Sequence, residues 1–413
     1  MRQLLFPKYY RDFKCIGPAC EDNCCTTNYE ITINKEDYQF MLYKSKLKDE
    51  AKNIFERTPD RETYARFKLD EKGHCPLITH DGWCRVYIED GEDHLPHVCK
   101  TYPRIADPRG TTLVDMSLTL GCPEAVRKLC FDPDALTFYE RKERVKGKMP
   151  KNTYKRPAYF KTIRELVRDI LYISDASFEE SLYTVGVALS SLSSYENSES
   201  KDVFEAIAQV RDQVAQGYPR MMFQQQASSF MHQSVFLSCC MERIEIFLVH
   251  YPDSNRRLRH LFGEFRKLLP EELRTEPLHK LSSLWLDKLS NPQALKRYHS
   301  YIKKHPQLWN NYALWQANDM DFPKSVWQVY STRVIFLYVY FRCCLILLAQ
   351  DRELTDDDFV LVVQSLHTAF HNQNMVVFMK QVQFGFDHCL DLATTTGFSL
   401  TPLILLQTMK SSV

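Results

Sequence analysis

The sequence predicts an α+β protein in which a small Cys-rich N-terminal domain is followed by an irregular all-α helical domain. Nine of the fourteen cysteines and seven of the twelve glycines lie before residue 148, where turn-forming residues interrupt short apolar runs. After residue 158, apolar residues recur at the three- and four-residue spacing of helices. We therefore expect three segments: a Cys-rich metal-binding domain over 1–140, a basic linker over 141–158 and a helical domain over 159–413.

The N-terminal segment is predicted to contain short strands, turns and a few helices. Residues 29–42, YEITINKEDYQFML, begin with the alternation of a strand and continue with a helical pattern. Residues 64–87, YARFKLDEKGHCPLITHDGWCRVY, indicate strands separated by turns at Lys72-Gly73 and Asp81-Gly82. The following run, RKERVKGKMPKNTYKR, carries eight Lys or Arg residues and one acid. It is either a solvated linker or a docking strip for an acidic partner.

The helical segment shows apolar faces, caps and joints. The first predicted helix has one apolar face, formed by Phe160, Ile163, Val167, Ile170 and Leu171. Ser177 and Glu180 form a capping box, and an apolar stripe over 203–214 ends at Gly217. Further helices are expected over 228–249, 254–269, 277–289, 292–304, 306–317, 324–350, 355–372 and 375–394. Because no fixed repeat period is present, an irregular bundle is favoured over a solenoid.

Composition and charge exclude several classes of protein. A formal net charge of +1 argues against nucleic acid as an obligate partner. The first residues lack the apolar run of a secretory signal, which predicts a reducing, cytoplasmic location. The longest apolar run, 334–349, is shorter than a membrane span and is interrupted by Arg342. We therefore expect a buried helix there and no membrane span.

Eight cysteines form the candidate metal site: Cys15, Cys20, Cys24, Cys25, Cys75, Cys84, Cys99 and Cys122. Clustered thiols among glycine and proline in a reducing compartment are more often metal ligands than disulfides. Vicinal Cys24 and Cys25 project in different directions. We therefore favour one four-thiolate site with cysteines in reserve over eight ligands around two centres.

The spacing of the thiols leaves the metal open. Four thiolates suit either zinc or an iron–sulfur cluster, and unligated structural thiols are the remaining alternative. Four nearby histidines could replace a thiolate in a zinc site: His74, His80, His94 and His97. The cysteines at 239–240, 343–344 and 389 lie in apolar helical patterns and are expected to pack as core residues.

The motifs FKCIGPACEDNCC, CPLITHDGWCRVY, LPHVCKTYPR and GCPEA, in this order over residues 13–125, resemble the flagellin lysine-N-methylase family with its CxxCxxCC-type zinc- or iron-chelating domain. The resemblance implies a bacterial cytoplasmic enzyme that methylates lysines of flagellin, its protein partner. It also implies S-adenosylmethionine as the methyl donor and an iron–sulfur cluster, 4Fe-4S in the first place, with zinc as the alternative. The family's cysteines correspond to the eight named above, and Cys130 lies outside the pattern.

Lysine methylation requires a neutral amine, whereas a free lysine is protonated at neutral pH. Groups in the Cys-rich part that could act as the base are Tyr87, Tyr102, Asp81 and Asp115. No Gly-x-Gly-x-x-Gly loop follows a strand, so a Rossmann-type methyltransferase is not supported. The cofactor is then expected in an unconventional pocket or on an open iron of the cluster. Three arginines near the cysteines are either solvated or offset the charge of the cluster: Arg85, Arg104 and Arg109.

Two other classes of function remain open. The first is a non-enzymatic zinc-binding interaction module whose helical domain docks a partner. The second is an iron–sulfur electron carrier, which is the weakest reading because a carrier has little need for so long a helical segment.

Overall fold

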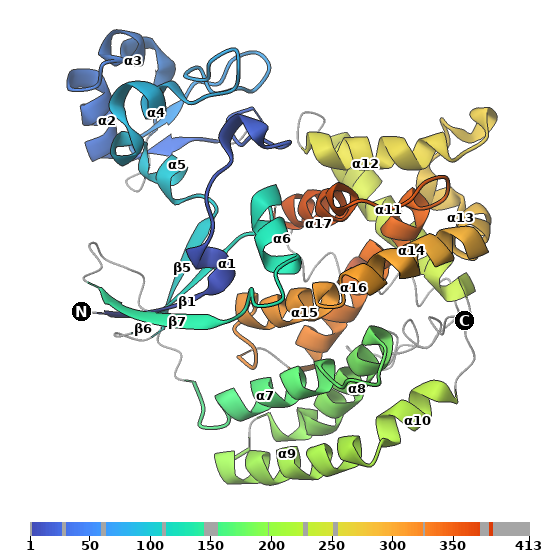
Figure 1. Ribbon diagram of the computed structural model, residues 1–413. Coiled ribbons are helices and arrows are strands. Elements are labelled where there is room, and N and C mark those ends of the chain that lie inside the picture. Colours follow the sequence, from blue (N-terminus) through green and yellow to red (C-terminus); the bar gives the residue numbers. More distant parts are fainter. Residues whose placement is uncertain are drawn as a thin grey trace.

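The computed structural model describes residues 2–26, 30–58, 63–109, 113–143, 156–196, 198–225, 230–250, 255–324, 327–371 and 380–382. A Cys-rich region and a sheet lie on one side of the molecule, and a helical region forms the other side (Figure 1). The α+β class and the helical C-terminal region are therefore confirmed. Most of the predicted linker, residues 144–155, and most of the predicted helix 375–394 lie outside the described residues.

The larger sheet joins segments that are distant in sequence. Its strand order is β5-β6-β1-β7, formed by β1 (Arg2–Pro7), β5 (Arg104–Arg109), β6 (Leu113–Leu118) and β7 (Phe138–Glu143). Strand β1 pairs in parallel with β6 and antiparallel with β7, so the start of the chain is an inner strand. Leu4 and Pro7 of this strand are buried, while its other positions stay half-exposed.

A second, smaller unit holds four of the eight candidate cysteines in or against its core. It contains a three-stranded sheet of order β2-β4-β3, formed by β2 (Thr32–Ile33), β3 (Phe55–Arg57) and β4 (Ala65–Phe67). Four short helices accompany it: α2 (Lys35–Tyr43), α3 (Lys48–Ile54), α4 (Arg85–Asp90) and α5 (His97–Thr101). Ile33, Met41 and Phe67 belong to its own apolar core, which is separate from the main one.

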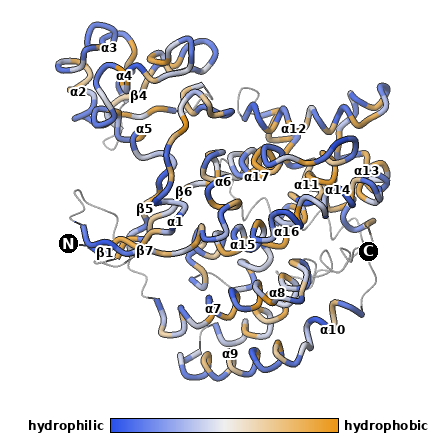
Figure 2. Tube along the Cα trace, in the orientation of Figure 1, coloured by the Kyte–Doolittle hydropathy of each residue, from blue (hydrophilic) through white to orange (hydrophobic). Residues whose placement is uncertain are grey.

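The main core is formed by helices from both ends of the chain. The N-terminal part contributes α1 (Lys8–Arg11) and α6 (Pro123–Cys130). The remaining helices are α7 (Phe160–Leu171), α8 (Phe178–Leu192), α9 (Ser200–Ala215), α10 (Tyr218–Gln224), α11 (Phe230–His250), α12 (Arg256–Lys267), α13 (Ser282–Leu289), α14 (Pro292–Lys304), α15 (Leu308–Asp319), α16 (Trp327–Leu348) and α17 (Asp356–His371). Hydrophobic and hydrophilic residues alternate along the outer helices α9 and α12, as expected where one face is buried (Figure 2).

Helix α16 is the centre of the bundle. Within the described residues it is the one helix long and apolar enough to cross a membrane, but 94% of its most apolar window is buried inside the protein. A helix that is buried on all sides carries apolar residues on all of its faces. Its sequence is therefore explained by its position in the core, as predicted.

Most of the predicted helices are confirmed to within a few residues. The capping box of Ser177 and Glu180 is present in both directions, and α14 has the predicted bounds 292–304. The predicted helix 277–289 was wrong in its first turn, because the Glu245 carboxylate accepts the Leu278 amide (2.8 Å) and a short 3-10 turn precedes α13. The predicted strands of 64–87 reduce to β4 and one isolated bridge between Ile78 and Cys84.

Candidate functional site

Five of the eight candidate cysteines meet at the smaller core. Cys75 is buried in that core, and Cys25, Cys84 and Cys99 pack against it. The Cys75 amide donates to the Cys25 carbonyl (2.8 Å), which holds the two cysteine loops together. The fifth is Cys24, whose thiol interacts with that of Cys25.

The other three cysteines lie where the Cys-rich region meets the helices. Cys15 is exposed and accepts a hydrogen bond from the Gly17 amide (3.4 Å). Cys20 is half-buried, and Cys122 is buried in the main core at the start of α6. The thiols of Cys15 and Cys20 are both close enough to Cys122 to interact with it electrostatically. The eight cysteines therefore form a group of five (24, 25, 75, 84 and 99) and a group of three (15, 20 and 122), and Cys24 of the first group also lies close enough to Cys20 of the second to interact with it electrostatically.

Burial keeps most of these thiols protonated. It raises the pKa of Cys20 to about 11 and those of Cys75 and Cys122 to about 12. The pKa values of Cys84 and Cys99 are also raised by burial. A metal bound here would have to displace these protons, which makes its binding dependent on pH.

The described residues contain no group of three or more His, Cys, Asp or Glu side chains that could hold a metal ion as they stand. A single zinc ion needs its sulfur ligands at about 2.3 Å, whereas an iron–sulfur cluster of several atoms separates its thiolate ligands more widely. The chemistry of the donor set fits either group, since both accept thiolates. Two of the four candidate histidines have other partners: His94 bonds the Asp90 carbonyl (2.7 Å) and stacks on Phe40, and His74 lies 3.7 Å from the Asp70 carboxylate.

Charged residues of the helices hold the loop that carries Cys20. Glu21 accepts a hydrogen bond from Arg127 of α6 (2.6 Å) and forms an ion pair with Arg257 of α12 (3.3 Å). Asp22 accepts a hydrogen bond from Gln364 of α17 (2.6 Å). This junction brings residues more than 200 positions apart into one polar cluster, and the sequence analysis missed Arg127, Arg257 and Gln364.

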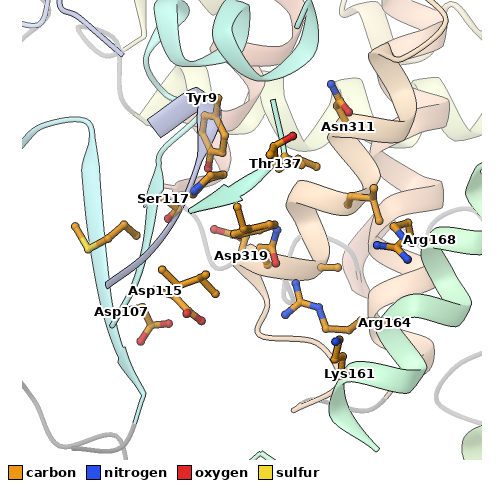
Figure 3. A pocket seen from close by; sticks show the side chains of 18 of the residues that line it. Tyr9, Asp107, Asp115, Ser117, Thr137, Lys161, Arg164, Arg168, Asn311 and Asp319 are labelled. Carbon is orange, nitrogen blue, oxygen red and sulfur yellow. The ribbon is translucent and has the colours of Figure 1, made fainter. Parts of the chain in front are cut away.

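A pocket of about 730 Å³ lies between the larger sheet and helices α7 and α15. Strands β5 and β6 form one wall, and Figure 3 shows Asp107 and Asp115 there, with Arg164 directed toward the space from α7. Asp319 of α15 lines the same pocket. Its volume is in the range of pockets that hold small molecules and cofactors.

Two carboxylates face each other in the wall of this pocket. Asp107 and Asp115 are direct partners in the antiparallel register of β5 and β6. Such partners have Cβ atoms about 5 Å apart, and like charges in this position repel unless a cation is nearby. Arg156 supplies a cation, because it bonds Asp115 and reaches Asp321 (3.4 Å). The pair of carboxylates makes this wall suited to a cationic ligand.

The opposite wall of the pocket carries three cations beside two carboxylates, Glu165 and Asp319. Arg164 and Arg168 of α7 line it together with Lys161. Burial, with the Arg156 cation beside it, lowers the pKa of Arg164 to about 10, so its guanidinium remains charged at neutral pH. The pocket therefore offers both signs of charge across one space, as a zwitterionic ligand requires.

The other described candidate residues do not line this pocket, and the side chain of Arg109 lies outside the described residues. Of the four candidate bases, Asp115 alone lines it; Tyr87 is exposed on α4. Arg85 forms an ion pair with Glu50, and Arg104 donates to the Phe13 carbonyl (3.4 Å). These contacts account for both arginines without a metal.

A comparison with known protein families identifies the family to which this fold belongs. The model of the FliB lysine N-methylase C-terminal domain matches residues 164–393, which is more than half of the chain. The chain belongs to the FliB lysine N-methylase family. The matched segment of the methylase domain supplies one pocket wall and part of the junction, with Arg164, Arg168, Asn311, Asp319, Arg257 and Gln364.

Similar curated proteins have flagellar or lysine-methylase names. The chain is 32% identical over 140 residues to the flagellar biosynthetic protein FliU of Salmonella muenchen, covering 33% of this chain and 82% of the relative. It is 32% identical over 142 residues to a lysine-N-methylase of Salmonella choleraesuis, covering 33% of this chain and 34% of the relative. The alignment thus spans about a third of that curated methylase. No solved structure matches the chain at a significant level.

Proposed function

We propose that this protein is a cytoplasmic, S-adenosylmethionine-dependent lysine N-methyltransferase that acts on flagellin. Membership of the FliB lysine N-methylase family supports the reaction. Relatives named lysine-N-methylase and flagellar biosynthetic protein support the choice of a flagellar protein as the substrate. The N-terminal cysteines are proposed to hold an iron–sulfur cluster.

The pair of Asp107 and Asp115 in the pocket is the observation that carries the proposed site of methyl transfer. A substrate lysine arrives as an ammonium ion, which the carboxylates attract. Burial in the pocket, with the sulfonium of the methyl donor and the arginine cations beside it, lowers the pKa of the amine, so that a carboxylate of the pair can accept its proton. The neutral lysine nitrogen then attacks the methyl carbon of the sulfonium, a C–N bond forms, the S–CH₃ bond breaks and a neutral thioether leaves. The proton lost by the lysine passes to a carboxylate of the pair.

The two arginines of α7 that line the pocket support the choice of methyl donor. S-adenosylmethionine carries a carboxylate, an ammonium group and a sulfonium. Arg164 or Arg168 can bind the carboxylate, while the aspartates across the pocket attract the cationic groups. An iron–sulfur cluster on the cysteines would supply redox chemistry or a Lewis-acidic iron when it is bound.

Mass spectrometry of flagellin tests the proposed function. The anaerobically purified chain is incubated with S-adenosylmethionine and the flagellin of the same bacterium, and we expect methyl groups on lysine residues. Asp107→Asn should lower the rate by at least tenfold, since general-base contributions are about 10²–10⁴-fold. Asp49→Asn, an exposed residue paired with Lys52, is the matched control.

An unmethylated flagellin with folded, metal-loaded protein would refute the enzymatic proposal. A colourless protein that contains zinc and methylates nothing would favour the alternative of a zinc-binding interaction module. Equal rates for Asp107→Asn and Asp49→Asn would remove the pocket from the mechanism while leaving the methylase proposal in place.

A further inference from the structure

Strand β5 is both an edge of the larger sheet and part of one wall of the pocket. Its inner side pairs with β6, and no strand in the described part of the chain pairs with its outer side. Arg104, Ile105 and Ala106 of this strand are exposed. The outer side of an edge strand presents backbone N–H and C=O groups that can pair with another extended chain. Strand β5 therefore offers a backbone binding surface directly beside the proposed site of methyl transfer.

The register of the sheet shows which residues of β5 direct their backbone groups outward. The Thr119 amide donates to the Pro103 carbonyl (2.9 Å), so these two residues form a hydrogen-bonded pair next to the ladder of β5 and β6. In an antiparallel ladder such pairs alternate with pairs that exchange no hydrogen bonds. Ile105 and Asp107 therefore direct their backbone groups to β6. The residues that direct them outward are Arg104, Ala106 and Pro108.

The position of Pro108 agrees with this assignment. Proline has no N–H group, and within sheets it is confined to places such as edges, where its nitrogen faces away from the neighbouring strand. Pro108 therefore leaves the pairing with β6 intact and removes one donor from the outer side. Because proline weakens pairing at an edge, an added chain would pair mainly with Arg104 and Ala106, which suits a segment that binds and leaves.

The side chains of β5 select what is added to this edge. Asp107 and Ile105 line the pocket. A residue placed opposite Asp107 by an added antiparallel strand would form a pair without hydrogen bonds, in which the Cα atoms are about 4.5 Å apart and the side chains are close. Its side chain would lie beside Asp107 and near Asp115, the direct partner of Asp107 on β6 (Figure 3). A cation suits this position, because opposite charges attract in cross-strand pairs.

We propose that the outer edge of β5 binds the substrate as an added antiparallel strand, with the target lysine opposite Asp107 and an apolar residue two positions later opposite Ile105. This deepens the proposed function, on which it rests for the choice of a lysine. Ile105 is 39% exposed, so an apolar side chain opposite it would remove apolar surface from water. The substrate class is then an extended segment that contains a lysine, and a lysine held in a helix is excluded.

The charge of Arg104 does not compete with the substrate lysine. Its cross-strand partner is Leu118, which lies on the side of the sheet opposite to that of Asp107. There the Arg104 guanidinium lies 5.1 Å from the centre of the Phe13 ring. The side of β5 that faces the pocket therefore presents Asp107 and Ile105 to an added chain, and Arg104 is held away from it.

Binding of a labelled peptide to the full-length chain tests the proposal without requiring turnover. The probe has nine residues, with a central lysine, a valine two positions after it and serine or threonine elsewhere, and its affinity is measured by fluorescence anisotropy. Methylating the backbone nitrogen of the residue directly after the lysine removes the donor that would face Ala106. We expect the affinity to fall about tenfold or more, because a hydrogen bond is lost and a carbonyl of the edge is left without a donor.

The matched control peptide carries the backbone methyl group two positions after the lysine. That nitrogen would face away from β5, because donors alternate between the two sides of a strand. This peptide should therefore bind like the unmodified one. Equal affinities of the two methylated peptides, or no binding of the unmodified peptide, would overturn the proposal.

A substitution in the protein tests the apolar position. Ile105→Ala should weaken binding of the unmodified peptide about threefold or more, because less apolar surface is buried. Ile88→Ala is the matched control, since Ile88 is an exposed isoleucine on α4 that does not line the pocket. The same affinity for both variants would show that no apolar residue is bound opposite Ile105 and would overturn the proposal as stated.

Methylation of flagellin by the same preparation is measured separately, which distinguishes this inference from the proposed function. A protein that methylates flagellin but binds both methylated peptides equally would refute the added strand and keep the proposed function. A protein that binds the peptides as expected and methylates nothing would refute the proposed function and keep the binding edge.

Discussion

Replacing Asn311 with alanine should destabilise the packing of α6 against α15. The Asn311 amide donates to the carbonyls of Leu129 and Asp132, both at 2.9 Å, and the residue is 1% exposed. Helix α6 ends at Cys130, so these carbonyls lie in and after its last turn, where intrahelical donors are lacking.

The magnitude follows from the groups that the substitution leaves behind. Each buried carbonyl without a donor costs about 1–3 kcal/mol. The substitution also removes the Asn311 Oδ1, which is buried without a hydrogen-bond partner in the described residues, and this offsets part of the lost stability. We therefore expect a net loss of about 2–4 kcal/mol in the free energy of unfolding.

Urea unfolding followed by tryptophan fluorescence measures this loss, because Trp309 and Trp315 lie on the same helix. The denaturation midpoint should fall while the slope stays unchanged. Asn310→Ala is the matched control, since Asn310 is half-buried and makes no side-chain hydrogen bond to any described residue. The same midpoint for both variants would refute the reasoning that Asn311 caps α6.

Two further predictions concern backbone conformation and pH. Gly17 has φ +56° and an added Cβ would lie 3.3 Å from the Trp83 ring, so Gly17→Ala should lower the stability by about 1–2 kcal/mol. Gly263 lies in a helix with open space around it, so Gly263→Ala should raise the free energy of unfolding by about 0.5–1 kcal/mol. The midpoints of thermal unfolding of the two variants should therefore shift in opposite directions. Burial alone would raise the pKa of Asp358, but the bonds from Arg352 (2.6 Å each) outweigh it and lower that pKa below its ordinary 3.8. The ion pair thus stabilises the fold at neutral pH, and this stabilisation is lost as the pH falls through the lowered pKa. Asp358→Asn should therefore be less stable than the unsubstituted protein at neutral pH and lose less stability in acid. Parallel curves of unfolding midpoint against pH for the two proteins would contradict this.

The helices could be predicted because their signals are local. Ser177 and Glu180 are three residues apart, and Asn291 precedes Pro292 at the start of α14, so the caps are visible in short windows of sequence. The same holds for the turn at Gly82, which has φ +85°. Such elements depend on neighbours within one or two turns.

The candidate site depends on contacts between distant residues, which spacing does not reveal. Asp115 could be named as one candidate base, but its partner Asp107 becomes visible only in the register of β5 and β6. Alternation of the two strands, with an aspartate in each, is the signal that could have found the pair. No local pattern marked Arg257 and Gln364, because their partners Glu21 and Asp22 are more than 200 residues earlier in the sequence.

The inner position of β1 has a consequence for how the chain is made. This strand leaves the ribosome before its neighbours β6 and β7, which follow more than a hundred residues later. Tyr9 and Phe13, directly after it, belong to a core completed by α15 and α16. Because synthesis proceeds at about 5–20 residues per second, the candidate cysteines leave the ribosome many seconds before the helices that complete the main core. The candidate cysteines are therefore exposed on the nascent polypeptide before the helices that cover them have been made.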